Sequence, residues 1–282
     1  MSFGRNTVFV TIALTLAGCA WSMSSQKRRA DAEQLAQSAN WHQFSIHVTG
    51  FDFEAFVPNR PNTSSVVTIY IEGDGAAWRS KHKPSDDPTP KDPTALKLAI
   101  AQPSGYAMYL SRPCQYTGWG AAGCDQKYWT NERFSERVVI AISEAIDVLK
   151  RQAGAAQIRL IGFSGGGAIA ALISDKRNDV IQLVTVSGNL NVTQWVLLHG
   201  LTPLDGLDPV LVAKNLQKLP QIHWVGSADE NTTPALVRGF VDQIPKPHKA
   251  TVIIKEGNRH NCCWAEQWAT LWRDISLGAN SD

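Results

Sequence analysis

A serine lies in the middle of a glycine-rich turn between an expected strand and an expected helix. Residues 162–166 read Gly-Phe-Ser-Gly-Gly; an apolar run, Ile158–Ile161, precedes them, and an Ala-rich run, Ala168–Ser174, follows. In so tight a turn, a Cβ two residues before or after Ser164 would collide with its neighbours, so glycines there let the serine stand strained and exposed. The first N–H groups of the helix would favour negative charge at the same place. The pattern is typical of a serine nucleophile.

Two phosphate-binding interpretations of the same glycines are weaker. Gly165-x-Gly167-x-x-Ala170 fits a loose dinucleotide fingerprint after a strand. The next expected strand, Val180–Val186, ends in Val-Ser-Gly, which offers no acidic side chain to hold a ribose hydroxyl. No Gly-Lys-Ser/Thr follows the glycines, which argues against a phosphate loop.

A nucleophilic serine needs a base, and the base needs an acid that orients it. Of the seven histidines, His260 alone directly follows a late strand, in the loop after Ala250–Lys255. Asp229 ends the preceding strand in a Gly-Ser-Ala-Asp turn. We therefore predict Ser164, Asp229 and His260 as the catalytic residues. Glu230 and Asp205 are weaker substitutes for the acid. We expect the other histidines near strands to be structural, namely His42, His47 and His223.

The pattern of apolar runs predicts a mostly parallel sheet with helices on both faces and an antiparallel hairpin at its start. In such a sheet, side chains that follow the carboxyl ends of strands gather at one edge. The expected strands are 41–48, 51–57, 66–71, 106–110, 158–161, 180–186, 221–226 and 250–255. The expected helices are 94–101, 131–152, 168–174, 233–243 and 265–277, with a surface loop over 80–93.

The chain order Ser164, Asp229, His260, together with the turn and the alternating elements, resembles the α/β-hydrolase superfamily from about Trp41 to the C-terminus. The resemblance implies an oxyanion hole formed by the Gly165 N–H and one N–H of the loop Glu72-Gly73-Asp74-Gly75. Gly73, Asp74 and Gly75 are all candidates, and Asp74 is favoured. Because a carboxylate would repel an oxyanion, we expect the Asp74 side chain to turn away from the site.

The N-terminus resembles that of a bacterial lipoprotein. A single basic residue, Arg5, precedes an apolar run that is too short to span a bilayer and ends in Leu16-Ala17-Gly18-Cys19. The resemblance implies cleavage before Cys19 and lipidation of its thiol. It also implies a cell-envelope location, at the outer membrane facing the periplasm. A plain secretory signal with an incidental cysteine is the alternative.

We thus expect a signal peptide over 1–18, a polar tether over 19–40 that is partly helical around residues 30–36, and a hydrolase domain over 41–282. Lys27, Arg28 and Arg29 would form a solvated face of the tether.

Four cysteines remain after Cys19. Their even number in an exported chain suggests disulfides, and we favour Cys114 with Cys124, which would close a glycine-rich loop. Cys262 and Cys263 would then form a bond between neighbours or stay reduced. Zinc is the rival interpretation, but the chain has no Cys-x-x-Cys, so no metal site is expected.

The composition of the chain argues against some classes of function. The net charge of +2 gives no electrostatic case for binding nucleic acid, and no cofactor motif is found. We expect a monomer that acts on a small or lipid-like acyl substrate. Trp78 and Trp129 are candidate pocket residues, and residues 189–204 are a candidate cap.

Three functions compete at this stage. Hydrolysis of an ester or a similar acyl bond comes first. A peptidase, amidase or acyltransferase using the same three residues comes second, because fold and triad do not separate these reactions. A non-catalytic protein that binds an envelope ligand is third.

Overall fold

The computed structural model describes the backbone of residues 15–80, 82–118 and 120–278, and within these ranges the side chains from residue 25 to residue 275. Its centre is a sheet of eight strands in the order β1-β2-β6-β3-β7-β8-β9-β10. These strands are β1 (Trp41–Val48), β2 (Phe51–Pro58), β3 (Val66–Ile71), β6 (Tyr106–Leu110), β7 (Gln157–Phe163), β8 (Val180–Val186), β9 (Gln221–Gly226) and β10 (Ala250–Lys255). A small separate hairpin consists of β4 (Trp78–Ser80) and β5 (Lys83–Pro84).

The sheet is parallel from β6 to β10 and antiparallel only at its N-terminal edge, as the sequence predicts. β1 and β2 form the expected hairpin, and β2 runs antiparallel to β6. β6 and β7 lie on opposite sides of β3, so the chain changes direction across the sheet at β3. Ligands of such sheets bind at the carboxyl ends of the strands beside this reversal. The loops after β3 and β7 are therefore the place to look for a site.

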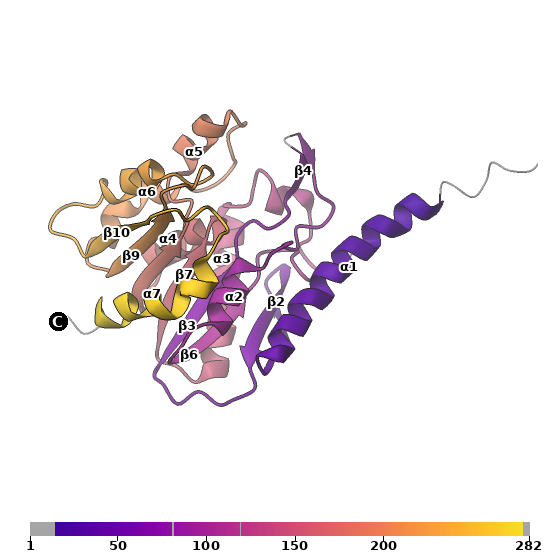
Figure 1. Ribbon diagram of the computed structural model, residues 1–282, viewed down its shortest axis with the longest axis horizontal. Helices are drawn as coiled ribbons and strands as arrows, with labels where there is room; N and C mark the ends of the chain where they lie inside the picture. The colour runs from indigo at the N-terminus through magenta and orange to yellow at the C-terminus, as the bar shows by residue number, and fades with distance from the viewer. Residues whose placement is uncertain (1–14, 81, 119, 279–282) are drawn as a thin grey trace, which may run out of the picture.

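Helices cover both faces of the sheet. α1 (Thr15–Ser38), α2 (Thr94–Ile100) and α7 (Trp264–Gly278) pack on one face, which is the one seen in Figure 1. α3 (Glu136–Ala153), α4 (Gly165–Lys176) and α6 (Pro234–Val241) pack on the other. α5 (Val192–His199) and β4 lie at the same end of the molecule, at the top of Figure 1. Three short 3₁₀ helices span Gln126–Trp129, Pro209–Leu211 and Ala213–Leu216.

Each face of the sheet has its own hydrophobic core, because side chains alternate along a strand. On β7, Ile158 and Leu160 join the core under α3, α4 and α6, while Ile161 and Phe163 join the core under α2 and α7. The second core is rich in tryptophan: the buried Trp268 ring makes edge contacts with Tyr70 and Trp224.

Two predicted segments differ from the structure for a clear physical reason. The long helix begins at Glu136 instead of Asn131, because the Ser135 side chain accepts the Val138 N–H and caps the helix there. The segment 80–93 is not a plain surface loop. It includes part of the β4–β5 hairpin, and its Asp87 and Thr89 are buried.

The segment that we expect to be a partly helical tether, residues 19–40, is helical as far as Ser38 and packs on the domain. Helix α1 runs to Ser38, and Ala32 and Ala36 on it are buried against the domain. Arg28 and Arg29 form ion pairs with the buried Asp87, so only Lys27 of the basic triplet lies on a solvated face. The composition of this segment is polar, but its two small residues at helical spacing allow the helix to dock closely.

Most of the predicted signal peptide lies outside the described residues, which begin at Thr15, and the side chain of Cys19 is not described. Cleavage, lipidation and the envelope location stay predictions. Within the described part of the chain, no helix combines the length and apolarity needed to cross a bilayer.

Because helix α1 packs on the domain, we expect leucine in place of a buried alanine and of an exposed alanine to differ in its effect on the free energy of unfolding. Ala36→Leu should lower the free energy of unfolding by about 1–3 kcal/mol, because the added volume has no room in a buried site. Ala30→Leu, on the exposed side, should change it by less than about 0.5 kcal/mol. Urea unfolding of the two variants measures this, and equal effects would restore the tether interpretation.

Candidate functional site

The turn between β7 and α4 holds Ser164 in a strained conformation. Its φ of 51° and ψ of −121° lie outside the ordinary helix and strand regions. A Cβ on Gly162 would lie 2.3 Å from the Gly166 carbonyl oxygen, and one on Gly166 would lie 2.2 Å from that of Ile71. Both glycines are thus required by backbone contacts, as the sequence pattern predicts. The result is a serine lifted above the end of the sheet.

The structure brings the three predicted side chains together at this place. The Ser164 Oγ lies 2.9 Å from His260 Nε2, and His260 Nδ1 lies 2.9 Å and 3.1 Å from the two carboxylate oxygens of Asp229. The three residues follow the carboxyl ends of β7, β9 and β10. Asp229 is buried, and His260 and Ser164 are partly exposed.

The hydrogen bonds around Asp229 determine which ring nitrogen of His260 carries its proton. Burial raises the pKa of Asp229, but hydrogen bonds and charge interactions, chiefly with His260 and also with the Thr232 N–H, outweigh it, so that the pKa is lowered overall. An ionised carboxylate only accepts hydrogen bonds, so Nδ1 of a neutral His260 donates to it. Nε2 is then the acceptor and faces the Ser164 hydroxyl. This arrangement can take up the serine proton during nucleophilic attack.

The loop after β3 lies beside Ser164 and offers backbone donors. The Gly73 N–H is already used, because it donates to the Glu72 carboxylate at 2.9 Å. Among the described residues, the Asp74 N–H has no acceptor, and Gly165 begins helix α4, so its N–H has none within the helix. Of the three predicted loop donors, Gly73 is therefore engaged elsewhere, whereas the N–H groups of Asp74 and Gly75 have no acceptor among the described residues.

The Asp74 side chain does not turn away from the site, contrary to our expectation. A Cβ on Gly165 would lie 2.1 Å from Asp74 Oδ1, so the carboxylate packs directly against this residue. Arg112 and Arg133 hold it there: Arg112 Nη1 lies 3.2 Å from Oδ1, and Arg133 Nη1 lies 2.9 Å from Oδ2. Their positive charge offsets the repulsion that led to the prediction. Sequence analysis missed both arginines because they lie between β6 and α3, 38 and 59 residues after Asp74 in the chain.

Asn231 also escaped the sequence analysis. Its side-chain NH₂ lies 3.0 Å from His260 Nε2, its Oδ1 accepts the Trp195 indole N–H at 3.2 Å, and its backbone N–H donates to Asp229 at 3.0 Å. Its carbonyl lies 2.9 Å from His199 Nε2. Asn231 thus joins helix α5 to both His260 and Asp229. Its position two residues after Asp229 is the only signal in the sequence.

A cavity of about 780 Å³ opens beside Ser164, a size that suits a small ligand. Residues of the expected cap, including Trp195 and Leu204, line it together with Trp78. Trp129 does not line this cavity and instead donates its indole N–H to the Ser85 carbonyl. His223 is buried inside β9, where burial lowers its pKa to about 3, so it is neutral and structural, as predicted.

The favoured bond between Cys114 and Cys124 is absent from the structure, where the two free thiols interact with each other. The disulfide joins Cys262 to Cys263, the bond between neighbours that the prediction left open. The Cys114 thiol lies near the Gly123 carbonyl and that of Cys124 near the Thr117 hydroxyl, so both have polar neighbours without a covalent bond. An even count allows three pairings, and spacing alone does not choose among them. Among the described residues, no group of His, Cys, Asp and Glu could hold a metal ion.

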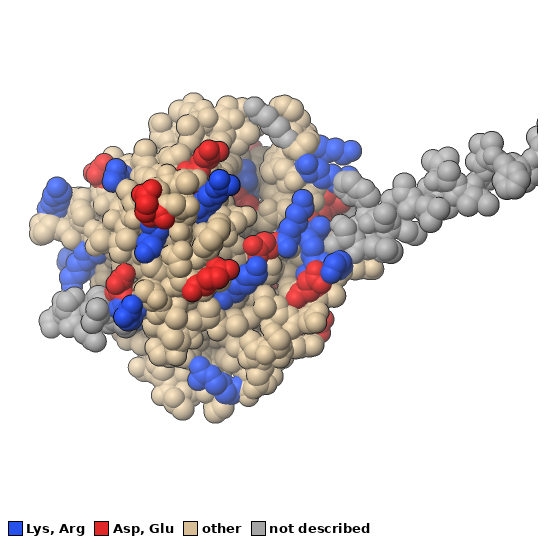
Figure 2. Space-filling view, in the orientation of Figure 1, with Lys and Arg blue, Asp and Glu red and all other residues tan. Residues whose placement is uncertain are grey.

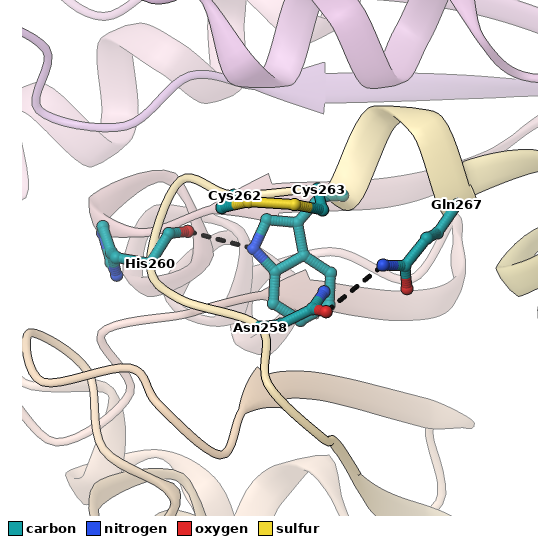
Figure 3. The surroundings of a disulfide bond; sticks show 6 residues. Asn258, His260, Cys262, Cys263 and Gln267 are labelled. Carbon is teal, nitrogen blue, oxygen red and sulfur yellow. Dashed lines mark hydrogen bonds between the residues drawn. A yellow bond between two sulfur atoms is a disulfide. The ribbon is translucent and has the colours of Figure 1, made fainter.

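The disulfide lies in the short stretch between His260 and the start of helix α7, as Figure 3 shows. The Trp264 indole N–H donates to the His260 carbonyl at 3.0 Å, and Gln267 donates to the Asn258 side chain at 3.2 Å. The backbone before and after His260 is therefore attached to the start of helix α7.

Glu72 is a buried acid behind the loop after β3. Burial raises its pKa to about 7 from an ordinary value of 4.5, and the hydrogen bonds from the backbone and Tyr109 only partly oppose this. At neutral pH the carboxyl group is therefore close to half protonated.

Asn231→Leu should slow the reaction of Ser164 with a fluorophosphonate probe by roughly fivefold to tenfold. This factor corresponds to the free energy of about one lost hydrogen bond. The substitution removes the link between Trp195 and His260 while keeping the side-chain size. The rate of labelling, measured at several probe concentrations, checks this.

Asn261→Leu is the matched control. Asn261 also borders the cavity, but it is exposed and its side chain has no hydrogen bond in the described structure. Equal rates in both variants would show that Asn231 does not position His260.

Glu72→Gln should alter the pH dependence of stability. Between about pH 4.5 and pH 7 folded Glu72 keeps a proton that the unfolded chain has released, so stability falls as pH rises through this window. Glutamine does not titrate. The stability of the variant relative to the parent should therefore rise with pH by on the order of 3 kcal/mol. Urea unfolding at pH 5, 6, 7 and 8 measures it, and a constant difference would contradict a raised pKa.

Solved structures resemble this chain in fold. Est1E from Butyrivibrio proteoclasticus has 14% identity and a TM-score of 0.60, over 85% of this chain and 99% of its own. An alpha-beta serine hydrolase homologue from Coxiella burnetii has 19% identity and a TM-score of 0.57, over 86% and 97%. An esterase from Pyrococcus furiosus has 13% identity and a TM-score of 0.59, over 86% and 92%. At such identities the likeness concerns the α/β-hydrolase fold alone.

No curated protein matches the sequence of this chain. The family model for serine hydrolase (FSH1) matches residues 101–261. This match covers more than half of the chain and includes Ser164, Asp229 and His260. The chain therefore belongs to the FSH1 serine hydrolase family.

Proposed function

We propose that this serine hydrolase cleaves a carboxylic ester through a Ser164–His260–Asp229 triad and an acyl-enzyme intermediate. The observation that carries the proposal is the continuous hydrogen-bonded chain from Ser164 Oγ to the Asp229 carboxylate, at the edge of a cavity of about 780 Å³.

The mechanism follows from the direction of these hydrogen bonds. His260 Nε2 accepts the Ser164 proton as Oγ attacks the substrate carbonyl, and Asp229 stabilises the resulting imidazolium. The N–H groups of Gly165 and Asp74 are the proposed donors to the oxyanion. His260 then gives the proton to the leaving alcohol, and water attacks the acyl-enzyme by the same steps in reverse.

The aromatic side chains in the cavity wall support a compact acyl substrate. Side chains from the β3 loop, the β4–β5 hairpin and the segment around α5 surround the cavity, and its wall includes Trp78, Phe163 and Trp195. Such a wall suits a small or lipid-like acyl group. The esterase from Pyrococcus furiosus shares the fold and is consistent with this choice.

Ser164→Ala should lower the rate of 4-nitrophenyl ester hydrolysis by at least about a thousandfold, because it removes the attacking oxygen. A series from acetate to palmitate, assayed with parent and variant, measures this loss, and the preferred chain length gives the size of the acyl site.

Ser80→Ala is the matched control, because Ser80 also lines the cavity but is exposed and without a side-chain hydrogen bond among the described residues. It should keep near-parental rates. Near-background rates from the parent would refute ester hydrolysis; labelling by a fluorophosphonate would then indicate an amidase or acyltransferase, and no labelling a binding protein.

A further inference from the structure

Two buried arginines share one carboxylate next to Ser164. The side chains of Arg112 and Arg133 are only 4% and 5% exposed, and both form their ion pair with Asp74. Arg112 also donates to the Arg133 backbone carbonyl at 2.5 Å. Buried charges in proteins are normally paired, so this cluster has one positive charge in excess.

Other charged groups of the cavity wall do not supply the missing negative charge. Asp92 pairs with Lys97 at 2.6 Å, and Arg79 pairs with Asp86. The charge of Glu72 favours the ionised form of Arg112, but burial raises the pKa of Glu72 to about 7, so this acid offsets only part of the excess at neutral pH. On the face seen in Figure 2, acidic and basic side chains are interspersed.

Of the two arginines, Arg133 is the one that lines the cavity, next to Asp74. Its guanidinium group lies over the rings of Trp195 and Phe134, with 5.5 Å and 5.8 Å to the ring centroids. Of its five N–H donors, only Nη1 has a protein acceptor among the described residues, and its buried Nε has none. The group is therefore held in place with donors unused.

We propose that Arg133 binds a second, anionic oxygen group of the substrate, a carboxylate or a phosphate. The inference rests on the proposed ester hydrolysis and names its substrate class: an ester that carries a negative charge away from the scissile bond. A planar guanidinium group stacked on an aromatic ring is well suited to such anions. Binding there would orient the ester toward Ser164.

The test compares esters that differ in charge. The 4-nitrophenyl esters of butyric acid, glutaric acid and 4-phosphonobutyric acid share a leaving group. Their acyl groups are neutral in the first, carry a free carboxylate in the second and carry a phosphonate in the third. The butyryl ester of 4-hydroxybenzoate places the carboxylate on the leaving group. For the parent protein, kcat/KM of at least one anionic ester should exceed that of its neutral counterpart, 4-nitrophenyl butyrate or phenyl butyrate, by about tenfold to a hundredfold.

Arg133→Met should abolish this preference, and Arg133→Lys should restore part of it. The readout is the ratio of kcat/KM for anionic and neutral esters, because a weakened Asp74 loop would lower both values together. Lys91→Gln is the control: Lys91 also lines the cavity, is exposed, and has no ion pair in the described structure. Its ratio should stay near that of the parent.

Three outcomes would overturn the inference. They are a ratio near one in the parent, an unchanged ratio in Arg133→Met, and a loss caused by Lys91→Gln instead. If Arg133→Met does not fold, Arg133→Lys and competitive inhibition of the parent by glutarate decide the question. Failure of the proposed function itself is distinct, because then no ester, neutral or anionic, is turned over.

Discussion

The contact between the β7–α4 turn and the end of β3 is the constraint on which the site depends. Gly162 and Gly166 let the turn close on itself and on the Ile71 carbonyl, and Gly165 lets it close on the Asp74 carboxylate. Because two of these contacts involve backbone atoms, the turn cannot shift without moving a central strand. Ser164 and the loop after β3 therefore have one relative position. This preorganisation is what stabilisation of a developing oxyanion requires.

The second layer of the site is built from buried charges. Arg112 and Arg133 neutralise Asp74 beside the serine, and Glu72 lies behind the same loop with a raised pKa. Such groups are costly to bury, and their placement around one loop ties its backbone to several distant segments. The same cost explains why an excess of positive charge in this cluster points to a ligand.

One residue, Asn231, links helix α5 to His260 and Asp229 through its side chain and its backbone. Asn231 contacts Asp229, His260 and Trp195 at once. Trp195 in turn lies over the Arg133 guanidinium group. Through Trp195, helix α5 therefore contacts both Asn231, which lies against His260, and Arg133 of the proposed anion site.

Local patterns were enough for the sequence to determine the mostly parallel sheet, the N-terminal hairpin, the strained turn at Ser164 and the order of Ser164, Asp229 and His260. Apolar runs and glycines act within a few residues of themselves, so they can be read along the chain. Only the tertiary structure decided the docking of α1, the disulfide between Cys262 and Cys263, the exclusion of the Gly73 N–H and the grouping of Asn231, Arg112 and Arg133 around the serine. Those features depend on side chains that meet from separate loops, and on competition for the same donors and buried space, which no spacing in the sequence records.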